Sequence, residues 1–196
     1  MKYDIRLLTK AADDLLRTVT NPRHRKILIN YRRHAMWEVC GMYEEICAPD
    51  SMVEDPKYLM YVGGFPIEYH GMDRVKALYK SMVEINASVM HFENEVLRVD
   101  DNGFSSRATF QIFMPGKVAL HFGASVGVDD MDEIFIQTSD RIMVWDYAED
   151  SRLIGENIWV GGGTFRKCPP EEVISREECI EKLMPLLDKV PEPGMS

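Results

Sequence analysis

The first half of the chain has apolar residues at helical spacing. One such series covers residues 5–19 and stops before Asn21 and Pro22, which predicts an N-terminal helix. Asn21 is a favourable N-cap and Pro22 suits a first helical turn, so a second helix is predicted over residues 22–46. A third helix is predicted over residues 71–85, where apolar residues again share one face.

The second half of the chain changes to patterns that are typical of strands. Residues 90–99 and 104–114 form two extended runs, and the Asn102-Gly103 pair between them is a strong signal for a type I′ hairpin turn. The glycines at 161–163 are expected to end the sheet, and residues 174–187 return to a helical pattern. Further strands are predicted over residues 134–137, 142–147 and 152–160, whereas residues 50–70 are expected to form a loop with short extended pieces and residues 115–132 a longer irregular stretch.

Helices followed by an antiparallel meander predict an α+β fold, in which a curved antiparallel sheet forms a cone over the N-terminal helices. Such a cone leaves a concave, mostly apolar cavity between the sheet and the helices, which is the usual place for a small ligand. We therefore divide the chain into an N-terminal helical extension (1–20), an α+β cone domain (21–163) and a C-terminal helical tail (164–196).

Composition and charge narrow the range of partners. The chain has 196 residues, 45% of them hydrophobic, with 23 Lys and Arg against 32 Asp and Glu. The resulting formal net charge of −9 repels nucleic-acid phosphates and anionic lipid. The four cysteines match neither a zinc-binding spacing nor a dense disulfide framework, and no run approaches about 18 apolar residues. We expect a soluble, cytoplasmic protein with no nucleic-acid or membrane partner.

Tyr31 and Asp55 are the strongest candidates for chemistry. Tyr31 lies on the long predicted helix, and Asp55 follows 24 residues later in the segment Met52-Val53-Glu54-Asp55-Pro56. A phenol and a carboxylate suit proton transfer on a small apolar ligand. Structural interpretations compete with this one, because an Asp-Pro pair is typical of a solvated turn and a tyrosine on an apolar stripe is typical of a core residue.

Three short segments carry a resemblance to a known family: Ala48-Pro49-Asp50, Val53-Glu54-Asp55-Pro56 and Gly71-Met72-Asp73-Arg74-Val75. Over residues 22–161 the chain resembles the nuclear-transport-factor-like superfamily, in particular the ketosteroid isomerases and the SnoaL-like polyketide cyclases. The resemblance implies a cystatin-like cone and a homodimer formed through the outer face of the sheet. It also implies that Asp55 is the general base and that Tyr31 donates a hydrogen bond to a developing enolate. The family's second donor falls on Met143, whose side chain cannot donate.

Two further residues could complete such a site. His91 falls where dehydratases similar to scytalone dehydratase have a pocket histidine, although a strand histidine bonded to a backbone carbonyl is an alternative. Glu156 shares one face of its predicted strand with Ile154 and Ile158. If that face is inward, Glu156 faces the cavity, and burial would then raise its pKa. If the side with Trp159 is inward instead, Glu156 faces solvent.

The resemblance implies a cofactor-independent acid-base enzyme, namely an isomerase, a cyclase or a dehydratase. Its substrate would be a small hydrophobic, ring-containing carbonyl compound such as a polyketide, steroid or terpenoid. Trp37, Met143 and Trp145 are expected to line the substrate pocket, and no histidine pair has the spacing of a helical metal site. The alternative is a non-catalytic module of the same fold that binds a small molecule or assembles as a dimer.

Overall fold

The longest helix, α2 (Pro22–Cys40), begins as the sequence predicts but ends early. In the computed structural model, which describes residues 2–125 and 128–194, the Asn21 side chain accepts hydrogen bonds from two backbone N–H groups of the first turn. The predicted continuation to residue 46 is wrong, because Gly41 adopts a left-handed conformation (φ +74°) that closes the helix. A separate short helix, α3 (Tyr43–Ile46), follows.

The other helices come from both ends of the chain and from its middle. The predicted N-terminal helix is divided into a 3₁₀ turn and α1, and the predicted helix over residues 71–85 is present as α4. The region that was expected to be irregular around residue 120 contains α5, and the C-terminal segment contains α6. Their bounds are Ile5–Leu7 for the 3₁₀ turn, Lys10–Leu16 for α1, Met72–Glu84 for α4, Gly116–His121 for α5 and Arg176–Leu183 for α6, with two more 3₁₀ turns at Pro170–Glu172 and Met184–Leu186.

Six strands form one sheet in the described part of the chain. Their order is β2-β1-β6-β5-β4-β3. Every neighbouring pair is antiparallel except β1 and β6, which run parallel, so the sheet is mixed rather than purely antiparallel as predicted. The bounds are Lys57–Val62 for β1, Phe65–His70 for β2, Met90–Val99 for β3, Gly103–Pro115 for β4, Ile134–Tyr147 for β5 and Leu153–Lys167 for β6.

Three strand predictions need correction. The expected loop over residues 50–70 contains the β1–β2 hairpin, which turns at Gly63-Gly64, both in the left-handed region. The two runs predicted at 134–137 and 142–147 are one continuous strand, β5. The glycines at 161–163 do not end β6, because the strand continues past them and pairs Lys167 with Phe135. The sheet therefore extends beyond the expected domain boundary at residue 163.

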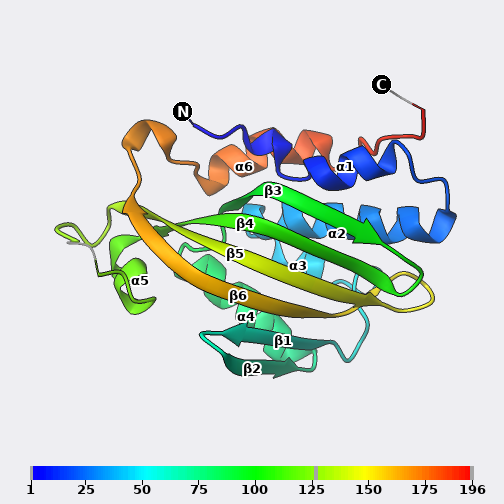
Figure 1. Cartoon of the computed structure of the whole chain (residues 1–196), viewed down its shortest axis with the longest axis horizontal. Coiled ribbons are helices and arrows are strands. Elements are labelled where there is room, and N and C mark those ends of the chain that lie inside the picture. The colour runs from blue at the N-terminus through cyan, green and yellow to red at the C-terminus, as the bar shows by residue number, and fades with distance from the viewer. Residues whose placement is uncertain (1, 126–127, 195–196) are drawn as a thin grey trace.

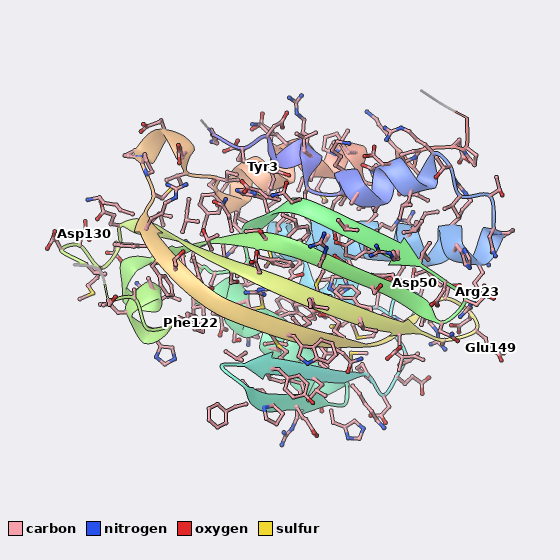
Figure 2. All side chains as sticks on the ribbon, in the orientation of Figure 1. Tyr3, Arg23, Asp50, Phe122, Asp130 and Glu149 are labelled. Atoms are coloured by element: carbon pink, nitrogen blue, oxygen red, sulfur yellow. The ribbon has the colours of Figure 1, made fainter. Side chains whose placement is uncertain are left out.

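The helices cover one face and one edge of the sheet. Figure 1 shows the long strands in front, α2, α3 and α4 behind them, and α1 and α6 along the edge formed by β3. Arg23 in the first turn of α2 donates to the carbonyl oxygen of Glu149 (2.6 Å), which holds the helix against the β5–β6 turn (Figure 2). The core lies between α2 and the concave side of the sheet, so side chains on these two surfaces face each other. None of the described helices is long and apolar enough to span a bilayer.

Candidate active site

A cavity of about 60 Å³ lies between α2, α4 and the concave face of the sheet. Most of its wall is apolar, and four of the apolar side chains are methionines. Five groups on the wall are polar, and they come from α2, α4, β5 and β6. The apolar lining consists of Ala35, Met60, Leu78, Met82, Met90, Phe92, Phe110, Met143, Trp145 and Ile158, and the polar lining of Tyr31, Glu38, Tyr79, Arg141 and Glu156.

Glu156 faces the cavity from β6, directly opposite Trp145 in the pairing with β5. It faces inward together with Ile158, as one of the two sequence interpretations required. Ile154, expected on the same face, turns outward and is 37% exposed, because a bulge between the Asp146–Gly155 and Tyr147–Leu153 pairs leaves it without a partner. Burial raises the pKa of Glu156 to about 8, and the negative charge of Glu38 adds to the increase.

A buried hydrogen-bond network holds Glu156 from the side of α2 and α4. Tyr79 donates from its hydroxyl to Oε1 of Glu156 (2.7 Å), and the same hydroxyl lies 2.9 Å from both Tyr58 Oη and His34 Nε2. Because the Tyr79 hydroxyl uses its proton in the bond to Glu156, the Tyr79 oxygen is the acceptor in its other two contacts. The Tyr58 hydroxyl and the Nε2–H of His34 are then the donors. Burial lowers the pKa of His34 to about 3, so the imidazole is neutral.

Glu38 and Arg141 form the second polar part of the wall. Burial raises the pKa of Glu38 to about 7, although the positive charge of Arg141 opposes the increase. Burial lowers the pKa of Arg141 to about 10, so its guanidinium is still charged at neutral pH, and it lies 4.6 Å from the centre of the Phe110 ring. Glu38 Oε2 is 3.8 Å from His34 Nε2, which in turn is 3.4 Å from Glu156 Oε1. Both carboxyl groups therefore approach the same nitrogen of one neutral imidazole.

The sequence analysis proposed none of Glu38, Tyr79 and His34 as site residues. A signal was present for two of them. Tyr31, His34 and Glu38 recur at intervals of three and four residues on α2, which places them on one face of a helix. Tyr79 reaches the same place from α4, and only the packing of α4 against the sheet could reveal that.

Tyr31 lines the cavity with its ring, but its hydroxyl is already bonded. It donates to Glu95 Oε1 (2.6 Å), and Ser106 donates to the same oxygen (2.8 Å). Glu95 lies within an irregularity of β3, where the pairing register with β4 shifts between Glu93 and Val96. The resemblance implies that the Tyr31 hydroxyl donates to an enolate. In the structure this hydroxyl donates to Glu95 instead, a residue that the sequence analysis did not indicate.

Asp55 does not share the cavity with Tyr31, and this expectation is wrong. Its side chain is 68% exposed, and Oδ2 lies 3.1 Å from Nε2 of His70, which is also exposed. Asp55 is not among the described residues that line the cavity. Asp55 precedes the buried Pro56, just before the first residue of β1. This position fits the competing interpretation, in which Asp55 is a solvated turn residue.

His91 and Trp37 also lie away from the cavity. Met90 and Phe92 line it, so the side chain between them on the strand points to the opposite side of the sheet. There His91 stacks on Tyr3 with ring centres 3.8 Å apart, at the edge of the sheet beside α1 and α6 (Figure 2). Trp37 packs against the core, and of the three expected pocket residues only Met143 and Trp145 are on the wall.

The polar groups of the cavity suit proton transfer rather than metal binding. Among the described residues, no group of three His, Cys, Asp or Glu side chains is arranged to hold a metal ion. Two carboxyl groups with raised pKa values and one guanidinium can accept a proton, donate a proton and stabilise negative charge.

Comparisons with known proteins agree with this architecture. No protein-family model and no curated protein matches the sequence. Among solved structures, an NTF2-like protein from Anabaena variabilis ATCC 29413 is similar with a TM-score of 0.54 and 10% identity over 74% of this chain and 94% of the other. The chain has the NTF2-like fold. A candidate SnoaL-like polyketide cyclase from Jannaschia sp. CCS1 is similar with a TM-score of 0.52 and 12% identity over 73% of this chain and 90% of the other. At such identities the likeness concerns the NTF2-like fold alone.

Proposed function

We propose that this protein is an acid-base enzyme that needs no cofactor and acts on a small hydrophobic, ring-containing carbonyl compound. One observation carries the proposal: two carboxyl groups with raised pKa values, Glu38 and Glu156, line the same mostly apolar cavity. Burying two carboxyl groups is costly for folding, and perturbed carboxyl groups in a cavity are typical of catalytic sites. The SnoaL-like name of one structural neighbour fits this class of chemistry.

The two carboxyl groups take different roles at neutral pH. Glu38, with a pKa of about 7, is partly ionised and removes a proton from the carbon next to the carbonyl group. The electrons of that C–H bond form a carbon–carbon double bond, and the carbonyl oxygen gains negative charge. Glu156, with a pKa of about 8, is mostly protonated and donates to that oxygen. Return of the proton from Glu38 to a different carbon completes an isomerisation.

The size of the cavity limits the substrate. A volume of about 60 Å³ is well below the roughly 300–1,000 Å³ of most ligand sites. Four methionines form much of the wall, namely Met60, Met82, Met90 and Met143, and their unbranched side chains adapt to a ligand more readily than other core residues. We therefore propose a one- or two-ring substrate whose entry displaces these side chains.

Exchange of ketone protons in D₂O tests the proposal. The protein is incubated with cyclohexenone or 2-tetralone, and deuterium incorporation is measured by mass spectrometry. Glu38→Gln removes the base and is expected to slow exchange by roughly 10²- to 10⁴-fold. Glu181→Gln, an exposed position on α6, is the matched control and should exchange like the wild type. Wild-type exchange no faster than buffer would refute the proposal.

The pH dependence of exchange gives a second readout. Exchange needs Glu38 ionised and Glu156 protonated, so the rate should rise as the pH passes about 7 and fall as it passes about 8. Glu38→Gln removes the rising limb and Glu156→Gln the falling limb.

A non-catalytic assembly module is the second candidate, and a surface observation favours it. Ile142 and Trp159 are paired neighbours on the outer face of the sheet, 54% and 42% exposed, and Tyr61 stacks on Trp159. Exposed apolar side chains on adjacent strands are typical of contact surfaces. Sedimentation of the wild type and of Ile142→Lys tests for a homodimer through this face. A dimer that catalyses no exchange would favour this second function.

A further inference from the structure

Trp145 carries a buried hydrogen-bond donor without a partner. Its side chain lines the cavity and is 3% exposed. Among the described residues, no acceptor lies within hydrogen-bond distance of its indole nitrogen Nε1. A buried N–H group without a partner is unfavourable for folding, so such groups are rare in native proteins and call for an explanation.

The indole ring is fixed by aromatic contacts on several sides. Its ring centre lies 5.4 Å from that of Tyr31, 4.7 Å from His34 and 5.0 Å from Phe104. The two polar neighbours bond elsewhere, because Tyr31 donates its hydroxyl to Glu95 and His34 Nε2 contacts Tyr79. The indole is therefore held in place by rings, while its N–H group is left without a partner among the described residues.

The chemistry of the wall indicates what the missing acceptor is. The polar groups beside Trp145 are two carboxyl groups and one guanidinium, which are suited to moving a proton and holding negative charge. An indole N–H does not titrate in the accessible pH range and can only donate. It complements an oxygen that carries lone pairs and gains charge during the reaction.

We propose that the indole N–H of Trp145 donates a hydrogen bond to the carbonyl oxygen of the ligand in this cavity. The proposal rests on the proposed function for the identity of the ligand, but it concerns binding and can be tested without turnover. Met143, two residues earlier on the same face of β5, lines the same cavity with an adaptable side chain.

Nuclear magnetic resonance of the indole N–H groups provides the direct test. The chain has three tryptophans, so a ¹⁵N-tryptophan-labelled protein gives three indole signals, assigned with Trp37→Phe, Trp145→Phe and Trp159→Phe. Phenol and toluene are the probes, since they have nearly the same size and phenol carries a hydroxyl group where toluene carries a methyl group. Phenol should move the Trp145 indole proton downfield and toluene should not. The Trp37 and Trp159 signals, which belong to side chains outside the cavity wall, serve as internal controls.

The variant Trp145→Phe keeps an aromatic ring and removes the N–H group. It should weaken phenol binding by about three- to tenfold and leave toluene binding unchanged, measured by calorimetry. If the variant does not fold, the comparison of the two probes on the wild type decides. Equal effects of phenol and toluene on the Trp145 signal would overturn the proposal, as would the binding of neither probe at millimolar concentration.

The result separates this inference from the proposed function. An indole shift with phenol, together with no ketone exchange, would refute the enzyme and keep Trp145 as a ligand donor. Exchange that depends on Glu38, together with an unmoved indole signal, would support the enzyme and refute Trp145 as a ligand donor.

Discussion

Two carboxyl groups that stand out in the sequence, Asp55 and Glu156, occupy opposite environments. Asp55 lies at the start of the β1–β2 hairpin with a side chain that is 68% exposed, and its contact is a surface histidine. Glu156 lies on the concave face of the sheet with a side chain that is 6% exposed, held by Tyr79 from α4. The motif that resembles the ketosteroid isomerases contains Asp55, whereas the buried cavity with polar groups contains Glu156.

The difference shows that a short motif does not determine burial. Water solvates the Asp55 carboxylate, whose side chain is 68% exposed. Removal from water disfavours the ionised form of Glu156 and raises its pKa to about 8. Reactivity therefore follows from the layer of the fold that a carboxyl group occupies rather than from its neighbours in sequence.

The largest expected contrast is in activity. Glu156→Gln cannot supply a proton and should slow ketone exchange by roughly 10²-fold or more. Asp55→Asn should exchange at the wild-type rate, because its side chain is outside the cavity. Both rates are measured by deuterium incorporation under the conditions given for Glu38→Gln. Loss of exchange in Asp55→Asn would break the comparison and return the site to the hairpin.

The same two regions should differ in their contribution to stability. Phe135 on β5 is 1% exposed and Phe65 on β2 is 76% exposed, so alanine at each position removes the same atoms from opposite environments. Phe135→Ala should lower the free energy of unfolding by about 3–5 kcal/mol and Phe65→Ala by less than about 0.5 kcal/mol. Urea denaturation followed by circular dichroism gives both values. Equal losses would mean that the hairpin end is packed rather than exposed.

The pH dependence of stability gives a smaller, signed effect. Between about pH 4.5 and 8 the folded protein keeps a proton on Glu156 that the unfolded chain releases, so this group makes folding less favourable as the pH rises. Glu156→Gln has no such proton. Relative to wild type, it should gain roughly 1–3 kcal/mol of stability between pH 5 and pH 9.

Asp55→Asn is the matched control for this titration. The side chain that it replaces is exposed rather than buried. Denaturant titrations at the two pH values provide the measurement for both variants. A Glu156→Gln curve parallel to wild type would show that Glu156 is ionised in the folded protein.

Local signals predicted the elements whose stabilising contacts are also local. Asn21 accepts hydrogen bonds from the first turn of α2, and the Asn102-Gly103 pair lies in the connection between β3 and β4. The predicted type I′ geometry of that connection is wrong, because Asn102 does not have the positive φ that such a turn requires. The parallel pairing of β1 with β6 was missed, because it joins residues about a hundred positions apart. It also depends on a close approach: a Cβ on Gly155 would lie 1.7 Å from the carbonyl oxygen of Lys57.

The sequence by itself determined which side chains share a strand face. Alternation puts Arg141, Met143 and Trp145 on the same side of β5, whatever the strand packs against. Only the tertiary structure decided that this side is the inner one. Bulges added the rest, because the extra residue at Ile154 is turned outward, away from the face of Glu156, and the shift after Glu93 lies where Glu95 meets Tyr31. Pairing between distant strands sets such shifts, so no local pattern contains them.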